Sequence, residues 1–215
     1  MSEPVILVER KPYGNRGHVA WITVNKVRRA NCLDHETLLA FADAVNEESK
    51  SPDLRAMVIT GAGERAFMAG ADLNVIAGQD ADGAKLFLTR VHRMCQSVRE
   101  CPVPVIARIN GACFGAALEL VAAEAIDAAK ALQWGLLEAV TDSHAALDAE
   151  VERVVGMIVH AAPNAMRLQK DLVRAWEGMG VDAAILEGIR VAERTYRLSN
   201  EPNAYAAKVL ASLKK

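Results

Sequence analysis

VPVIARINGACFGAALEL, residues 103 to 120, runs from an apolar segment through a corner of very small residues into a segment with one carboxylate, Glu119. Residues 57 to 72, MVITGAGERAFMAGAD, repeat this arrangement of buried strand, glycine-rich corner and helix. Small side chains let a ligand approach the main chain, and the first turn of a helix leaves N–H groups that can bind a negative oxygen. Two such corners facing each other would form an oxyanion hole, with Glu119 in reach for proton transfer or water orientation.

Each of these features also has a purely structural interpretation. Glycine and alanine before a helix commonly serve close packing. A lone glutamate near a helix N-terminus complements the helix dipole, and Asp72 is well placed to be an N-cap. From the residues alone, both interpretations stay open.

Composition excludes several classes of protein. The 215 residues are 52% hydrophobic and 24% charged, as in a globular protein, and the net charge of -2 with few aromatic residues argues against a nucleic-acid partner. Charges interrupt the most apolar stretch, residues 118 to 129, so no membrane segment is expected. The four cysteines form no C-x-x-C pair and the N-terminus shows no export signal, which predicts a reduced, cytoplasmic protein. The five histidines form no ligand cluster, so no metal site is expected.

Hydrophobic periodicity predicts an α/β body followed by helices. The predicted strands are residues 5–8, 18–24, 54–61 and 103–109, the first two joined as a hairpin by a turn at 11–17, with a further brief strand at 136–141. The first predicted helix begins after its N-cap, Asp34. The other predicted helices span residues 83–99, 127–135, 148–160, 163–176, 182–196 and 203–213. We divide the chain into a core of residues 1–123 and a helical region of residues 124–215 that is not an independent unit.

Four motifs in order resemble the enoyl-CoA hydratase, or crotonase, superfamily. ITGAGERAFMAGADL resembles its G-x-G-x-x-A-F-x-A-G-A-D pattern, and CPVPVIARINGACFGAALELVAA its P-V-I-A-x-I-N-G-x-A-x-G-G-G-x-E-L pattern. VNKVRRANCLD and IDAAKALQWGLLEAV are similar to an earlier and a later family motif. The resemblance covers nearly the whole chain and implies a crotonase-like spiral of strand-strand-helix units. It also implies a helical C-terminal region that packs against other subunits in a homotrimer or homohexamer.

The resemblance also implies an activity, the reversible hydration of a 2-enoyl-CoA. The amides of Ala71 and Ala116 would bind the thioester oxygen, and Glu119 would hold or deprotonate water. Ala116 stands where many members have glycine, which a main-chain donor tolerates. Coenzyme A is part of the substrate, so no separate cofactor is expected. The implied substrate-binding residues are Arg28, Arg29, Ala30, Ala69, Gly70, Asp72, Leu73 and Gly115.

The second glutamate of the hydratases is missing from this sequence. ELVAA is followed at once by EAIDAAKALQWG, which resembles a stretch that the family reaches a few dozen residues later. Deleting a central strand would be severely destabilising, so we expect that the sequence omits a segment between residues 123 and 124. The alternatives are another enolate reaction (isomerase, dehalogenase, decarboxylase or thioester hydrolase), a non-catalytic acyl-CoA-binding subunit, or a helical oligomer without a ligand.

Overall fold

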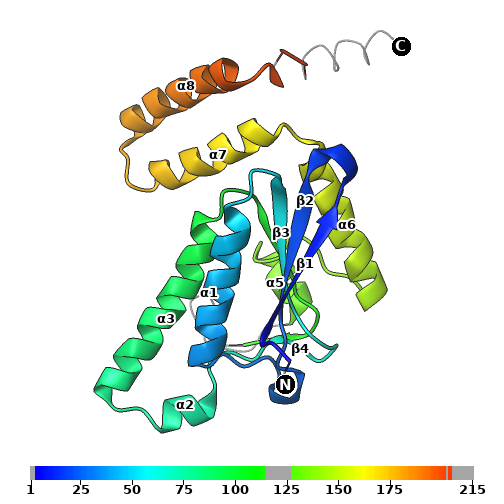
Figure 1. The fold of residues 1–215 in the computed structure, drawn as a ribbon, viewed down its shortest axis with the longest axis vertical. Coiled ribbons are helices and arrows are strands. Elements are labelled where there is room, and N and C mark those ends of the chain that lie inside the picture. The colour runs from blue at the N-terminus through cyan, green and yellow to red at the C-terminus, as the bar shows by residue number, and fades with distance from the viewer. Residues whose placement is uncertain (1–2, 115–126, 202, 205–215) are drawn as a thin grey trace.

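The computed structural model describes residues 3–114, 127–201 and 203–204, and its centre is a four-stranded sheet in the order β1-β2-β3-β5 (Figure 1). β1 and β2 are antiparallel, whereas β2, β3 and β5 are parallel. The predicted hairpin is therefore confirmed. The predicted turn at 11–17 was too long, because Pro12 still pairs with His18. The strands are β1 (Ile6–Pro12), β2 (His18–Val24), β3 (Leu54–Gly61) and β5 (Val105–Arg108).

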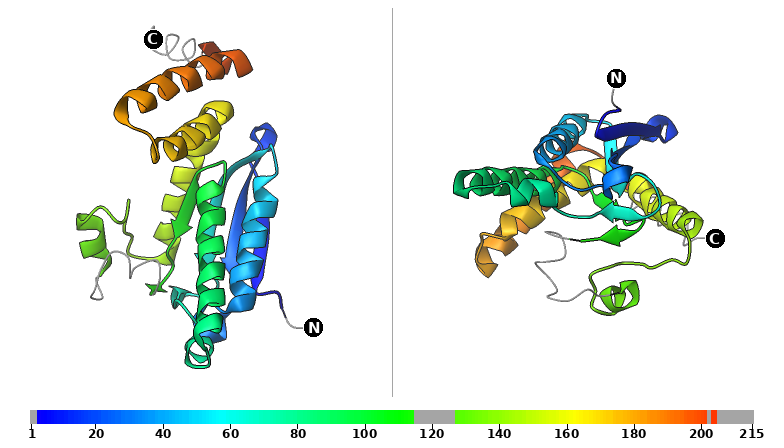
Figure 2. Two further views of the ribbon diagram at one scale, coloured as in Figure 1. Left: turned by 90° about the vertical axis from the view of Figure 1, so that its left-hand side faces the viewer. Right: turned by 90° about the horizontal axis from the view of Figure 1, so that it is seen from below.

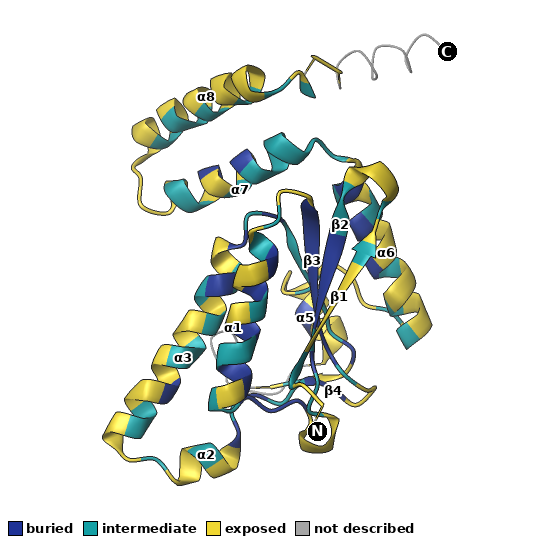
Figure 3. Cartoon of the chain, viewed as in Figure 1, coloured by how far each residue is buried: buried dark blue, intermediate teal, exposed yellow. Residues whose placement is uncertain are grey.

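Alternating side chains give the sheet two buried faces. Ala20, Ile22 and Val24 of β2 pack in one cluster with side chains of α1 (His35–Ser49) and α3 (Ala81–Glu100). Val19 and Trp21 of β2 face the other way and pack in a second cluster with α6 (His144–His160). Figure 3 shows β2 and β3 buried throughout most of their length, as expected for strands covered on both sides.

Side-chain caps set where the helices begin. Asp34 accepts the N–H of Thr37 as the predicted N-cap of α1, and Asp80 accepts that of Gly83, so α3 begins before the predicted residue 83. α6 begins at His144 rather than at residue 148, because Ser143 accepts the N–H of Ala146.

The predicted strand at 136–141 was wrong. α5 (Ala128–Gln133) is capped by Trp134, and Gly135, whose φ of +75° lies in the left-handed region, then turns the chain away. The residues that follow are mostly exposed and pair with no strand among the described residues. An apolar run without a sheet edge beside it does not become a strand.

A second, smaller sheet was missed by the sequence patterns. β4 (Ala66–Met68) and β6 (Ala112–Cys113) pair in parallel and lie in the two glycine-rich corners. Asp72 then caps α2 (Leu73–Ala77), accepting the N–H of Asn74, so its predicted role as an N-cap is confirmed. The two corners are therefore joined by main-chain hydrogen bonds as well as by neighbouring strands.

Two helices, α7 (Pro163–Trp176) and α8 (Val181–Leu198), lie beyond one end of the sheet (Figure 2). Arg167 of α7 donates to the carbonyl oxygens of Ser51, Pro52 and Leu54, where β3 begins. Only residues 203–204 of the predicted helix at 203–213 are described, and both are helical. The proposed omission between residues 123 and 124 lies outside the described residues. In the described part of the chain, no helix is long and apolar enough to cross a membrane.

Candidate active site

Ala71 is held by a single parallel bridge to Leu33. Leu33 donates its N–H to the carbonyl oxygen of Gly70 at 2.8 Å and accepts the N–H of Asp72 at 2.9 Å. In a parallel bridge, the residue between the two bonded groups turns its own N–H and C=O to the opposite side. The Ala71 N–H has no acceptor within the described residues. This amide is therefore a main-chain donor that a ligand can use.

The register of β4 and β6 brings the second corner alongside the first. Met68 pairs with Cys113, and Phe114 donates its N–H to the carbonyl oxygen of Met68 at 3.0 Å. Ala71 and Ala116 each follow the members of that pair by three positions. Ala116, together with Gly115 and Glu119, lies outside the described residues.

Gly111 permits this close approach of the two corners. A Cβ at this position would lie 2.6 Å from the carbonyl carbon and oxygen of Arg65 and 2.7 Å from the amide nitrogen of Ala66. Contacts this short with main-chain atoms exclude any side chain unless β6 moves away. The glycine therefore serves the pairing of the two corners.

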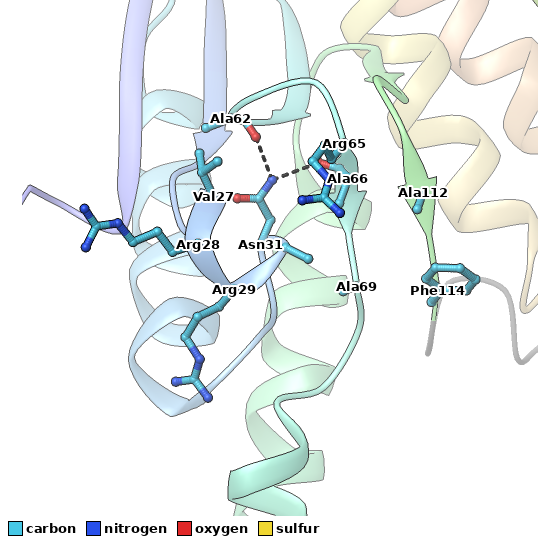
Figure 4. Close-up of a pocket in the computed structure, with 11 residues that line it drawn as sticks. Val27, Arg28, Arg29, Asn31, Ala62, Arg65, Ala66, Ala69, Ala112 and Phe114 are labelled. Atoms are coloured by element: carbon cyan, nitrogen blue, oxygen red, sulfur yellow. Dashed lines mark hydrogen bonds between the residues drawn. The ribbon is translucent and has the colours of Figure 1, made fainter.

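A cavity of about 380 Å³ opens between the turn at Val27–Arg29 and the two short strands (Figure 4). Arg28, Arg29 and Arg65 line it, and no carboxylate does so among the described residues. Ala30, Ala69 and the half-exposed ring of Phe114 contribute apolar surface. A cavity with arginines at its walls suits a phosphate-bearing ligand with an apolar part.

Arg29 is already paired within the protein. Its Nη2 lies 2.7 Å and 2.5 Å from the two carboxylate oxygens of Asp72, which is 3% exposed. Burial raises the pKa of Asp72, but hydrogen bonds from Asn74 and Cys32 and the charge of Arg29 outweigh burial and lower the pKa below its ordinary value. Asp72 is thus an ionised structural group. Within the described residues, Arg28 and Arg65 have no carboxylate partner.

Only some of the predicted substrate-binding residues line the cavity. Arg28, Arg29, Ala30 and Ala69 line the cavity. Gly70 and Asp72 instead flank Ala71 through their bonds to Leu33. The side chain of Leu73 is 79% exposed at the start of α2.

Two buried asparagines connect the site, and neither was singled out from the sequence. Asn31 donates to the carbonyl oxygens of Ala62 and Ala66 at 3.0 Å and 2.8 Å. Asn110 donates to those of Gly61 and Gly63 at 2.8 Å and 2.6 Å. Arg65 was also missed. The carbonyl groups to which Asn31 and Asn110 donate are remote in sequence. The only sequence signal for a role in the site was therefore that each residue lies inside a motif.

The cysteines near the site are protonated thiols. Burial raises the pKa of Cys32 and of Cys113, and all four cysteines are free. A thiol that is mostly protonated at neutral pH is a poor nucleophile. Within the described residues, the site therefore offers main-chain donors and arginine charge rather than a thiol nucleophile.

Comparison with known proteins agrees with this geometry. The fold and site define a crotonase-like α/β protein, and the crystal structure of enoyl-CoA hydratase from Mycobacterium smegmatis superposes with a TM-score of 0.84 at 22% identity, over 97% of each chain. Residues 14–126, more than half of the chain, match the enoyl-CoA hydratase/isomerase family. The chain belongs to this family, and the predicted fold class is confirmed.

Two curated relatives share about half of this chain. It is 39% identical over 121 residues to the probable enoyl-CoA hydratase EchA14 of Mycobacterium tuberculosis, covering 56% of this chain and 44% of that protein. It is 30% identical over 117 residues to the mitochondrial Delta(3,5)-Delta(2,4)-dienoyl-CoA isomerase of Homo sapiens, covering 49% of this chain and 35% of that protein. The matched part of the chain thus spans less than half the length of either relative.

Proposed function

We propose that this chain carries the active site of an enzyme that reversibly adds water to a 2-enoyl-CoA thioester. The observation that supports the proposal best is the Ala71 amide, which is turned away from Leu33 and lies two residues beyond the arginine-lined cavity at Ala69. Arg28 and Arg65 suit the phosphates of coenzyme A, and the thioester would extend from the cavity to the amide.

The proposed reaction passes through an enolate. The oxygen of water bonds to C3 of the enoyl group, Glu119 takes one proton of that water, and the electron pair of the double bond moves onto the thioester oxygen. Ala71 and, by resemblance, Ala116 donate their N–H groups to this oxygen. C2 then takes a proton from a second acid, which we assign to the omitted segment. In a protease, losing one such donor costs about 2.7–4 kcal/mol of transition-state stabilisation.

A second candidate is double-bond migration in an enoyl-CoA. The similarity to a dienoyl-CoA isomerase supports it. The same donors would stabilise the same type of enolate, but a proton would move along the acyl chain and no water would add. The absence of the second glutamate from the sequence is compatible with this reaction.

A panel of acyl-CoA substrates separates the candidates. Loss of the conjugated thioester absorbance of a short 2-enoyl-CoA, with a 3-hydroxyacyl-CoA as product, supports hydration. A shifted double bond without hydration identifies an isomerase. Calorimetric binding of acyl-CoA without turnover of any panel member refutes the enzymatic proposal in favour of a binding subunit, and absence of binding indicates a ligand-free oligomer.

We also propose that the protein is a homotrimer or homohexamer. α8 exposes Val181, Ile185 and Ile189 to solvent in the single chain, each more than half exposed. Burying such a row against another subunit would be favourable. Light scattering coupled to size exclusion tests this, and a monomer would refute it.

A further inference from the structure

Asn31 lies at the junction between two segments of the site. Lys26 to Leu33, which we call the arginine turn, carries Arg28 and Arg29, and Ala66 to Asp72, which we call the donor corner, carries the Ala71 amide. We propose that Asn31 is a positioning residue that holds the donor corner against the arginine turn and so sets the direction of the Ala71 N–H. The inference rests on the proposed function in one respect, that this amide binds a thioester oxygen.

Asn31 is 1% exposed, and among the described residues its side chain bonds only to main-chain groups. Its Oδ1 accepts the N–H of Lys26 at 3.0 Å, within the arginine turn. Its Nδ2 donates to Ala66 at 2.8 Å, at the start of the donor corner, and to Ala62 at 3.0 Å. Figure 4 shows this amide between the two carbonyl groups it binds. One buried side chain thus ties both segments together.

The main chain around Asn31 also bonds to the donor corner, as do the side chains of Arg29 and Cys32 through Asp72. Ala30 accepts the N–H of Ala69 at 3.1 Å, and Leu33 makes the two bonds that flank Ala71. Ala30 and Asn31 have φ of +50° and +55°. Asparagine tolerates this left-handed conformation better than most residues. The side chain that stabilises this bend therefore also determines where Leu33, and with it the Ala71 amide, lies.

Two substitutions separate the effect of the Asn31 side-chain hydrogen bonds from the effect of its left-handed backbone conformation. Asn31→Gly keeps the left-handed bend available and removes every side-chain bond. Asn31→Asp keeps the shape but replaces the donor with a carboxylate facing two carbonyl groups. Asn25→Asp is the matched control, because Asn25 directly precedes the arginine turn but its side chain bonds to Pro4 and Glu3, outside the site.

The probe is butanoyl-CoA with carbon-13 at the thioester carbonyl, a saturated thioester that cannot be hydrated. The measured quantity is the infrared stretching frequency of that carbonyl. Binding to the wild type should lower the stretching frequency, because hydrogen bonding polarises the carbonyl. Both Asn31 variants should lose most of that shift and retain a Kd within about fivefold. With a 2-enoyl-CoA, kcat should fall about 100-fold, as for loss of an oxyanion donor, with KM changed less than about fivefold.

Several results would overturn the inference. These are an undiminished carbonyl shift in a folded Asn31 variant, a loss of shift in Asn25→Asp, and no shift in the wild type. Failure of both Asn31 variants to fold would also overturn it, because Asn31 would then act on the fold and not on the donor. If the wild-type protein lowers the carbonyl frequency but hydrates no substrate, only the proposed hydratase function is refuted. The inference about Asn31 is then tested by the loss of the frequency shift in its variants.

Discussion

Lys26 Nζ lies 2.5 Å from Oδ2 of Asp34, and this ion pair closes the arginine turn at its base. Asp34 also accepts the N–H and the hydroxyl of Thr37, so one carboxylate both ends the turn and begins α1. Both side chains are largely buried. The placement of the site therefore depends on the ionised form of Asp34.

We predict a pH-dependent loss of stability that originates at Asp34. Burial raises the pKa of Asp34, but hydrogen bonds from Lys26 and Thr37 outweigh burial and lower the pKa to about 2. Because the folded pKa is below the unfolded value of about 3.9, the stabilisation is present above pH 4 and disappears as pH falls toward 2. Its size is about 2 kcal/mol. Urea unfolding of wild type and Asp34→Asn between pH 2 and 6 measures it, and parallel pH profiles would contradict the prediction.

Arg28 and Arg65 should contribute to acyl-CoA affinity. Arg28→Ala and Arg65→Ala are each expected to weaken binding about fivefold, since an exposed ion pair contributes up to about 1 kcal/mol. The loss should shrink at high salt, because salt screens exposed charges. Calorimetry at two salt concentrations measures both effects. Arg194→Ala on α8 is the control, and an equal loss in that variant would show that the effect reflects net charge alone.

Glu119→Gln should abolish most hydratase turnover and retain acyl-CoA binding. The amide keeps the size of the side chain but cannot take a proton from water, and general acid-base groups typically contribute 10²–10⁴-fold. We expect kcat to fall at least about 100-fold with little change in Kd. Turnover equal to that of the wild type would remove Glu119 from the reaction.

Gly111→Ala should destabilise the protein by about 1–3 kcal/mol, the range typical of overpacking. The new Cβ would meet the main chain of Arg65 and Ala66, so β6 would have to move away from β4. Gly156→Ala is the control, because nothing lies within 4 Å of a Cβ in the middle of α6. That change should stabilise by about 0.5–1 kcal/mol through helix propensity. Thermal unfolding of both variants measures the contrast, and similar midpoints would contradict it.

Long, periodic segments were predictable from the sequence, and short ones were not. The predicted bounds of β2 and α7 match the structure, since each has a clear period and, for α7, a proline at its first position. β4 and β6 are three and two residues long, so no period could develop. The false strand at 136–141 had strand-like residues but no neighbouring strand to pair with.

The same division applies to the site. The family resemblance predicted Ala69 and Ala71 as site residues because both lie inside a contiguous motif, and Ala69 does line the cavity. Asn31 and Asn110 act on carbonyl groups more than 30 residues away in sequence, so their roles emerge only when the chain is folded. Arg65 was not recognised for a similar reason, because its cavity exists only once the arginine turn lies opposite β4.

The donor at Ala71 is a peptide amide, which every residue type except proline possesses. Genetic drift can therefore exchange the side chain at this position without deleting the N–H group that we propose binds the thioester, provided that the bridge to Leu33 persists. A serine or histidine catalyst has no such tolerance, because a single codon change removes it. With such a donor, the residues that line the surrounding cavity can change while the proposed N–H donor is retained.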